Sequence, residues 1–117
     1  MNRILLGKEG EARARKYLQK KGYTIVTQNY RCRFGEIDLI VEKEQALIFI
    51  EVRYRHSTDY GLPQETVIKR KQARIKKAAT LYLLGQNLWD KVDCHFDIIS
   101  IYQAQGQEKI EHIRDAF

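Results

Sequence analysis

Three carboxylates interrupt the most apolar part of the chain. The stretch 35-GEIDLIVEKEQALIFIEVRYR-55 predicts two strands joined by a polar turn, yet it carries Glu36, Asp38 and Glu51 within its apolar runs. An acid in such a position costs free energy unless it is paired or bound to a cation. These side chains are therefore candidates for a metal site or for a salt-bridge cluster.

A turn centred on Glu44 and Gln45 would fold this stretch into a hairpin. Asp38 then faces Glu51, and Glu36 faces Arg53. Because side chains alternate between the two faces of a strand, one face of the hairpin is wholly apolar. The other face is apolar near the turn and ionic at the far end, and it carries Glu36, Asp38, Ile40, Phe49, Glu51, Arg53 and Arg55.

Two chemical interpretations fit the facing acids. Cross-strand neighbours have Cβ atoms roughly 4.5–5.5 Å apart, which is close enough to share one hard cation. Mg²⁺ or Mn²⁺ held there could lower the pKa of a bound water and polarise a phosphate. Alternatively, Arg33, Arg53 or Arg55 neutralises the acids in a surface salt-bridge cluster. The register alone leaves both interpretations open.

Glu11 adds a third acid from another part of the chain. Residues 4–21 show helical periodicity, with Gly22 as the stop signal. Glu11 lies on the inward stripe of this helix, where we expect it to join Asp38 and Glu51. It could instead lie at the rim and bond a backbone amide or an arginine. The stripe consists of Ile4, Gly7, Glu11, Ala14 and Leu18.

The remaining pattern predicts the elements that position these acids. We expect a strand at 23–28, a basic loop at 29–35, the hairpin, a polar loop at 56–63 and a helix at 64–84 that ends at Gly85. A strand at 94–102 follows, and 108–113 is either a further strand or a docking tail. The order α-β-β-β-α-β predicts an α/β fold with a mixed central sheet flanked by helices. The second helix has the inward stripe Ile68, Gln72, Ile75, Ala79 and Tyr82.

Composition bounds the class of protein. The 117 residues fit one domain, 1–117, and 44% hydrophobic with 31% charged residues is typical of a globular chain. The longest apolar run is five residues, 46–50, too short to span a membrane. The first residues lack a signal-peptide core, so we expect a cytoplasmic location. Cys32 and Cys94 have no metal-site spacing, and we expect reduced thiols.

Charge points to a polyanionic partner. Lys and Arg total 21 against 15 acids, giving +6 and a pI near 9.4. Nucleic acid is the first candidate for such a partner. The alternative is that the basic charge serves solubility alone. The three histidines are widely spaced and predict no zinc site.

Several motifs together resemble one known family. The segments 35-GEIDLI-40 and 49-FIEVRYR-55, with 7-GKEGE-11, 71-KQAR-74 and 96-FD-97, resemble the YraN family along nearly the whole chain. That resemblance implies the restriction-endonuclease-like fold of PD-(D/E)xK nucleases, in particular the Holliday-junction resolvase and tRNA-endonuclease-like branch. It also implies a two-fold dimer.

The resemblance assigns roles to the acids. Glu11, Asp38 and Glu51 match the family's metal-binding acids, for Mg²⁺ or Mn²⁺, and Arg53 falls where the motif has lysine. Arginine keeps its proton, so Arg53 cannot act as a general base, although it could hold a phosphate or stabilise developing charge. Lys71 on the second helix could replace the missing lysine, or it could be a solvated helix residue. The predicted catalytic set is Asp38, Glu51 and Arg53.

These assignments predict a metal-dependent endonuclease acting on structured DNA, with DNA favoured over RNA. The alternative is a nucleic-acid-binding module of the same fold without turnover; a protein-interaction domain with a basic surface is a third hypothesis. Tyr30, Tyr54 and Tyr60 could stack on bases or pack in the fold, and Asp97 is expected to be structural. The predicted nucleic-acid contacts are Arg31, Arg33, Arg55, Lys69, Lys71, Gln72 and Arg74.

Overall fold

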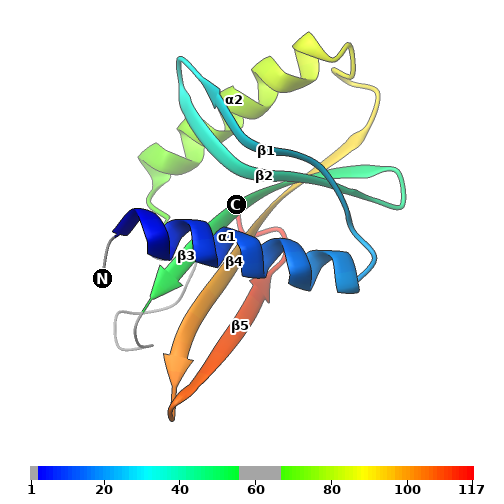
Figure 1. Ribbon diagram of the computed structural model, residues 1–117. Helices are drawn as coiled ribbons and strands as arrows, with labels where there is room; N and C mark the ends of the chain where they lie inside the picture. Colours follow the sequence, from blue (N-terminus) through cyan, green and yellow to red (C-terminus); the bar gives the residue numbers. More distant parts are fainter. Residues whose placement is uncertain (1–2, 56–66) are drawn as a thin grey trace.

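The computed structural model describes residues 3–55 and 67–117, with side chains from residue 8 onward (Figure 1). Two helices and five strands follow one another along the chain. They are α1 Arg3–Lys20, β1 Thr24–Cys32, β2 Gly35–Lys43, β3 Ala46–Arg55, α2 Lys69–Gly85, β4 Asp93–Ala104 and β5 Gln107–Ile113. Neither helix in the described part is long and apolar enough to cross a membrane.

The five strands form one mixed sheet in the order β1-β2-β3-β4-β5. β1, β2 and β3 form an antiparallel meander, β3 and β4 are parallel, and β5 returns antiparallel to β4. A parallel pair needs a long crossover connection, and here it includes α2. The predicted α-β-β-β-α-β core with a mixed sheet and flanking helices, the restriction-endonuclease-like element order, is thus confirmed.

The two helices cover opposite faces of the sheet. Ala14 and Leu18 of α1 pack in the cluster that contains Leu39, Val41, Ile48, Ile50, Ile99 and Ile101. Ile75, Ala79 and Tyr82 of α2 pack in the cluster that contains Ile37, Ile40, Phe49 and Ile98. The period-two alternation of the strands therefore sends neighbouring apolar residues into two separate cores. Burial of these side chains supplies the main driving force for the fold.

The β2–β3 hairpin has the predicted register. Its cross-strand pairs run from Lys43 with Ala46 to Leu39 with Ile50. The turn residues Glu44 and Gln45 both have positive φ, 52° and 69°. Two left-handed residues give the turn a twist that matches the flanking strands. The position of the turn therefore aligns the acids of β2 with those of β3.

β1 is longer than the sequence pattern predicted. The expected basic loop at 29–35 is wrong for its first four residues, because Tyr30, Arg31 and Cys32 pair with β2. Tyr30 packs edge-on against Tyr82 of α2, with ring centroids 5.3 Å apart. Tyr30 and Cys32 also pack against the core on the α2 side of the sheet, so the strand continues past Gln28 although Asn29 and Arg31 are polar.

The second helix begins later than predicted. Ile68 precedes α2 in an extended conformation and is 62% exposed, so it is not part of the inward stripe. The predicted residues 64–66 of this helix, and the loop at 56–63, lie outside the described residues. At the C-terminal end, 107–113 forms the strand β5, so the strand interpretation is confirmed and the docking-tail interpretation is not.

Candidate functional site

Three carboxylates from two elements converge at one end of the sheet. Glu11 of α1 and Glu36 and Asp38 of β2 each place one oxygen within 4.8 Å of the others. Gly10 lets the helix approach closely, because a Cβ there would lie 3.3 Å from Cδ2 of Tyr54. We predicted that Glu11 would join Asp38 and Glu51. The structure brings Glu11 and Asp38 together, but the third acid of this group is Glu36 and not Glu51.

Asn29 lies between two of these acids and was not predicted from the sequence. Its Nδ2 donates to both oxygens of Glu11 at 3.2 Å and to Oε1 of Glu36 at 2.7 Å. Its φ of 49° is left-handed, a conformation that asparagine tolerates better than most residues. An asparagine after an alternating strand is therefore the only sequence signal that could have indicated this role.

Glu36 does not pair with Arg53 as the hairpin register suggested. It lies opposite Arg31 of β1, and the two side chains form an ion pair at 3.4 Å. The prediction was wrong because it ended β1 at residue 28 and so left β2 without a neighbour on that side. With β1 extended, Asn29 and Arg31 are the nearer partners of Glu36.

Asp38 is held by the backbone of the adjacent strand. The N–H of Val52 donates to Asp38 Oδ2 at 2.8 Å, just beyond the last β2–β3 pair, Leu39 with Ile50. Burial raises the pKa of Asp38 from 3.8 to about 7, and the negative charges of Glu51, Glu11 and Glu36 add to this effect. The Val52 hydrogen bond opposes it. A positive charge near Asp38 would therefore be strongly favoured.

Glu51 is buried on β3, with 4% of its side chain exposed. Lys71 of α2 donates from Nζ to Glu51 Oε1 at 2.6 Å, and Nη1 of Arg53 lies 3.8 Å from the same oxygen. Lys71 is thus not merely a solvated helix lysine, although 41% of its side chain is exposed. The ammonium group of Lys71 therefore lies beside Glu51. Glu51 belongs to the strand segment in which Arg53 stands where the nuclease motif has lysine.

A cavity of about 640 Å³ opens between the sheet and the start of α2. Acids line its sheet side and cations line its helix side. This arrangement could hold a hard cation on the acids and an anionic group on the helix. The lining residues are Phe34, Gly35, Glu36, Asp38, Glu51, Ile68, Arg70, Lys71, Arg74 and Ile75.

Most of the predicted nucleic-acid contacts do not line this cavity. Lys69 is exposed at the first residue of α2, and Gln72 donates to the carbonyl of Val67 at 2.8 Å. The guanidinium groups of Arg33 and Arg55 lie over the rings of Phe34 and Tyr102 at 4.9 and 5.8 Å. Of the predicted set, only Lys71 and Arg74 line the cavity, and Arg70 joins them.

Two of the three candidate stacking tyrosines take part in packing. Tyr30 contacts Tyr82, and the guanidinium of Arg13 lies 5.9 Å from the ring centroid of Tyr54. Tyr60 lies outside the described residues. Cys32 and Cys94 are free thiols, as predicted.

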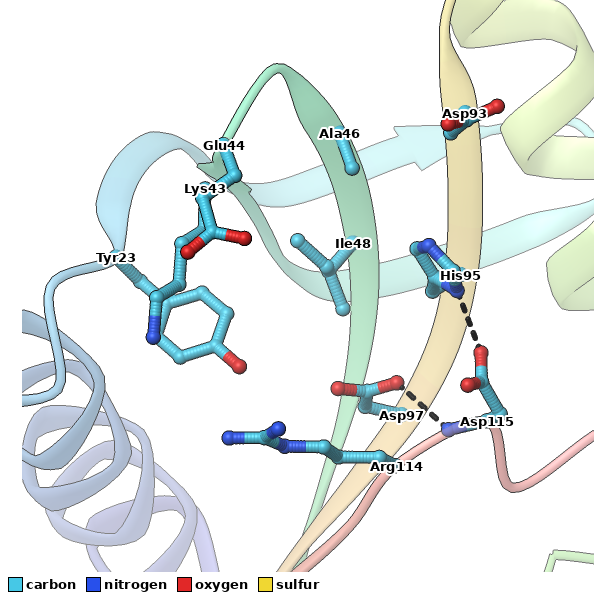
Figure 2. Close-up of a pocket in the computed structure, with 10 residues that line it drawn as sticks. All are labelled: Tyr23, Lys43, Glu44, Ala46, Ile48, Asp93, His95, Asp97, Arg114 and Asp115. Atoms are coloured by element: carbon cyan, nitrogen blue, oxygen red, sulfur yellow. Dashed lines mark hydrogen bonds and ion pairs between the residues drawn. The ribbon is translucent and has the colours of Figure 1, made fainter.

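A second cavity, of about 400 Å³, lies near the β2–β3 turn (Figure 2). Asp97 borders it, but both its oxygens are engaged: Oδ1 accepts from the N–H of Asp115 at 3.0 Å, and Oδ2 lies 2.7 Å from Nε2 of His112. His95 pairs with Asp115 at 2.6 Å. These contacts fasten the end of β5 to β4, which confirms the structural role expected of Asp97.

The fold and the cavity define an α/β protein with a mixed sheet and an acidic cluster opposite a basic helix. The model of the uncharacterised protein family UPF0102 matches residues 10–101, and the chain belongs to this family, the YraN family of the sequence resemblance. The UPF0102 protein of Syntrophomonas wolfei is 45% identical over 117 residues and covers all of both chains. That of Persephonella marina is 44% identical over 111 residues, covering 95% of this chain and 91% of its own.

Among solved structures, SfsA of Pyrococcus furiosus in complex with Ca²⁺ aligns with a TM-score of 0.36 and 13% identity. The alignment covers 97% of this chain and 64% of that one. The fold assignment therefore rests on the strand order and pairing of the chain itself.

Proposed function

We propose that this protein is a metal-dependent nuclease that hydrolyses phosphodiester bonds in structured DNA. The observation that carries the proposal is the convergence of Glu11, Glu36 and Asp38 within 4.8 Å. Glu36 and Asp38 share a cavity with Glu51 and with the cations of α2. A site that binds a divalent cation together with a phosphate needs carboxylates for the cation and basic side chains for the phosphate.

The acids fit a divalent cation of the Mg²⁺ or Mn²⁺ type. Their oxygen donors are the hard ligands such ions prefer. Burial, with the negative charges of the neighbouring acids added, raises the pKa of Asp38, so a bound cation would be favoured there. When bound, such an ion supplies a water of lowered pKa and a Lewis acid for the phosphate. Asp38, Glu11 and Glu36 are the proposed ligands from the converging group, and Glu51, which lines the same cavity as Asp38, is a further proposed ligand.

The basic residues hold the substrate in this proposal. Arg70 and Arg74 lie on the first turns of α2 and line the cavity, where they contact phosphates of the nucleic-acid backbone. Lys71 supplies the ammonium that the strand motif lacks, next to Glu51. Arg53, which stays protonated, stabilises negative charge that develops on the phosphate.

One observation favours the second candidate function, a nucleic-acid-binding module without turnover. Glu51 is already neutralised by Lys71 at 2.6 Å, with Arg53 at 3.8 Å. An internal ion pair of this kind can keep a carboxylate away from a metal. The module would bind nucleic acid in a salt-sensitive way that does not require a divalent cation.

Cleavage assays separate the two functions. Labelled branched, single-stranded and duplex DNA, with RNA counterparts, are incubated with the protein and Mg²⁺ or Mn²⁺. The proposal expects metal-dependent cleavage that Asp38→Asn and Glu51→Gln each abolish. Glu42→Gln, which removes an exposed acid from β2 away from the cavity, is the matched control and keeps activity.

Binding in EDTA without cleavage under any metal would establish the module instead. Cleavage that survives Asp38→Asn and Glu51→Gln would show a contaminating enzyme and contradict the proposal. Lys71→Ala adds a finer readout. If Lys71 acts in the chemistry, this variant lowers the cleavage rate much more than it weakens substrate binding.

A further inference from the structure

β5 lies at the edge of the sheet, so the backbone N–H and C=O groups on its outer side pair with no other strand in the described part of the chain. It pairs with β4 along its whole length, and in the described part of the chain no other strand lies on its far side. The β4–β5 hairpin extends beyond α1 (Figure 1). Because hydrogen bonding alternates along antiparallel strands, the pair Ala104 with Gln107 at the tight turn directs the N–H and C=O of 108, 110 and 112 outward.

We propose that β5 pairs antiparallel with β5 of a second copy of this chain, about a two-fold axis through Ile110. An open edge with unmet N–H and C=O groups is a template for another strand. A two-fold axis makes each contact occur twice. The proposed partner is therefore the same strand of an identical chain, and its sequence determines which register is favourable.

Charge complementarity selects the register. With Ile110 on the axis, Lys109 lies opposite Glu111 of the second copy, and Glu111 lies opposite the second Lys109. Opposite charges at facing positions stabilise a strand pair, and like charges destabilise it. A register centred on Lys109 would place two lysines together, and one centred on Glu111 would place two glutamates together. The register through Ile110 avoids both conflicts.

The side chains of β5 suit this arrangement on both faces. Lys109 and Glu111 are exposed, whereas Glu108 and His112 on the α1 face are held by Arg13 and Asp97 at 2.7 Å each. Ile110 is a large apolar residue that is 39% exposed. It borders a groove of about 360 Å³ between α1 and β5. The two copies of Ile110 meet at the axis and are removed from water there.

The pairing would extend the sheet across both copies. An axis perpendicular to the sheet leaves the two α2 helices on the same face, so both acidic cavities would lie on one side of the dimer. The functional meaning of this placement rests on the proposed function, whereas the strand pairing itself does not. A short strand interface is small, so we expect a dissociation constant on the order of 10–100 µM.

Sedimentation velocity over a concentration series from about 10 to 300 µM tests the pairing. The wild-type chain should shift from monomer to dimer. Lys109→Glu alone and Glu111→Lys alone should each stay monomeric, because each creates facing like charges. An equimolar mixture of these two variants should form dimers, since every facing pair is then of opposite charge. The double variant should also recover the dimer.

Lys91→Glu, at an exposed position before β4, is the matched control and should dimerise like the wild-type chain. A wild-type chain that remains monomeric throughout overturns the proposal. So does a mixture of the two single variants that stays monomeric, or a control that dissociates as they do. Thermal melts of each variant check that the fold is intact, and association in the mixture requires folded strands in both chains.

Discussion

At the scale of single residues, the acids of the site differ in how far neighbouring groups offset their negative charge. Glu51 has Lys71, and Glu36 has Arg31 and Asn29. Asp38 has a backbone N–H from Val52 but no cationic partner among the contacts that the structure describes, and its pKa is raised to about 7. Asp38 is therefore the residue at which an added positive charge would have the largest effect.

The metal-free protein should become more stable when Asp38 is replaced by asparagine. The pKa of Asp38 in the folded protein, about 7, exceeds its reference value of 3.8. The stabilising contribution of the protonated side chain to the free energy of unfolding is therefore complete below pH 3.8. It is lost as the pH rises through 7. At pH 8 we expect Asp38→Asn to raise the free energy of unfolding by on the order of 2–4 kcal/mol.

Urea denaturation in EDTA at pH 5 and pH 8 measures this difference. The advantage of Asp38→Asn should grow with pH, and Glu42→Gln should show no such growth. Mn²⁺ should reverse the order at pH 8, because it stabilises only the wild-type chain. An advantage that is equal at both pH values would contradict the raised pKa.

Asn29 should set how well the acids bind a cation. Asn29→Ala removes the amide that bridges Glu11 and Glu36, so their orientation is lost. We expect a fall of roughly 10- to 100-fold in Mn²⁺ affinity, as for other residues that orient ligands. Isothermal titration calorimetry measures the change without any activity assay.

The matched control for this experiment is Asn87→Ala. Asn87 also has a left-handed φ, 58°, but lies just after α2, away from the acids. Both variants incur the same kind of backbone strain, and only Asn29→Ala loses the bridge. Equal Mn²⁺ affinity in the two variants would show that Asn29 serves only the left-handed backbone position in β1 and does not orient the acids.

At the scale of elements, the site depends on how closely α1 approaches the sheet. Gly10 is buried against Tyr54 and Ile101, and the next residue is Glu11. A larger side chain would separate helix from strand and move Glu11 away from Asp38. The same short segment therefore determines both packing and the position of one acid.

Gly10→Leu should destabilise the protein by about 1–3 kcal/mol through overpacking. It should also reduce the rise in melting temperature caused by Mn²⁺. Gly85→Ala is the control, because a Cβ at the end of α2 meets nothing within 4 Å and alanine favours helix. Thermal melts with and without Mn²⁺ compare the two. A full metal response in Gly10→Leu would show that Glu11 is not needed.

Local patterns predicted some elements much better than others. The polar turn at Glu44 and Gln45 was enough to predict the β2–β3 register, and helical periodicity located Glu11. The extension of β1 to Cys32 was missed, because Asn29 and the two arginines made 29–35 resemble a basic loop. The residues that hold this segment, Tyr82 and Glu36, are supplied by the tertiary fold. For the same reason the sequence left two alternatives for Lys71, a replacement for the motif lysine or a solvated helix residue, and did not predict its ion pair with Glu51.

At the scale of the whole molecule, the net charge of +6 is unevenly placed. The first turns of α2 carry exposed Lys69, Arg70 and Arg74 beside the acidic cluster. A polyanion bound there would bring its phosphates to the carboxylates, and a cation would offset the repulsion between them. The distribution of charge thus matters more to the proposed function than its total.

Binding to duplex DNA should weaken steeply with salt. Each phosphate contact contributes about 0.9 to the slope of log K against log salt concentration. Arg70→Ala combined with Arg74→Ala should lower that slope by about 2. Lys20→Ala, on α1 across the sheet, should leave it unchanged. Fluorescence anisotropy in EDTA from about 50 to 200 mM salt gives the slopes. An equal loss in both variants would place the binding surface elsewhere.

The most direct test of the central claim is a crystal of the protein soaked in Mn²⁺ and measured at the manganese absorption edge. We predict an anomalous peak about 2.1 Å from a carboxylate oxygen of Asp38, with Glu11, Glu36 or Glu51 as further ligands. Crystals of Asp38→Asn should lack this peak. No peak at the acids in the wild-type crystal, or one confined to the cavity beside Asp97, would contradict the metal site.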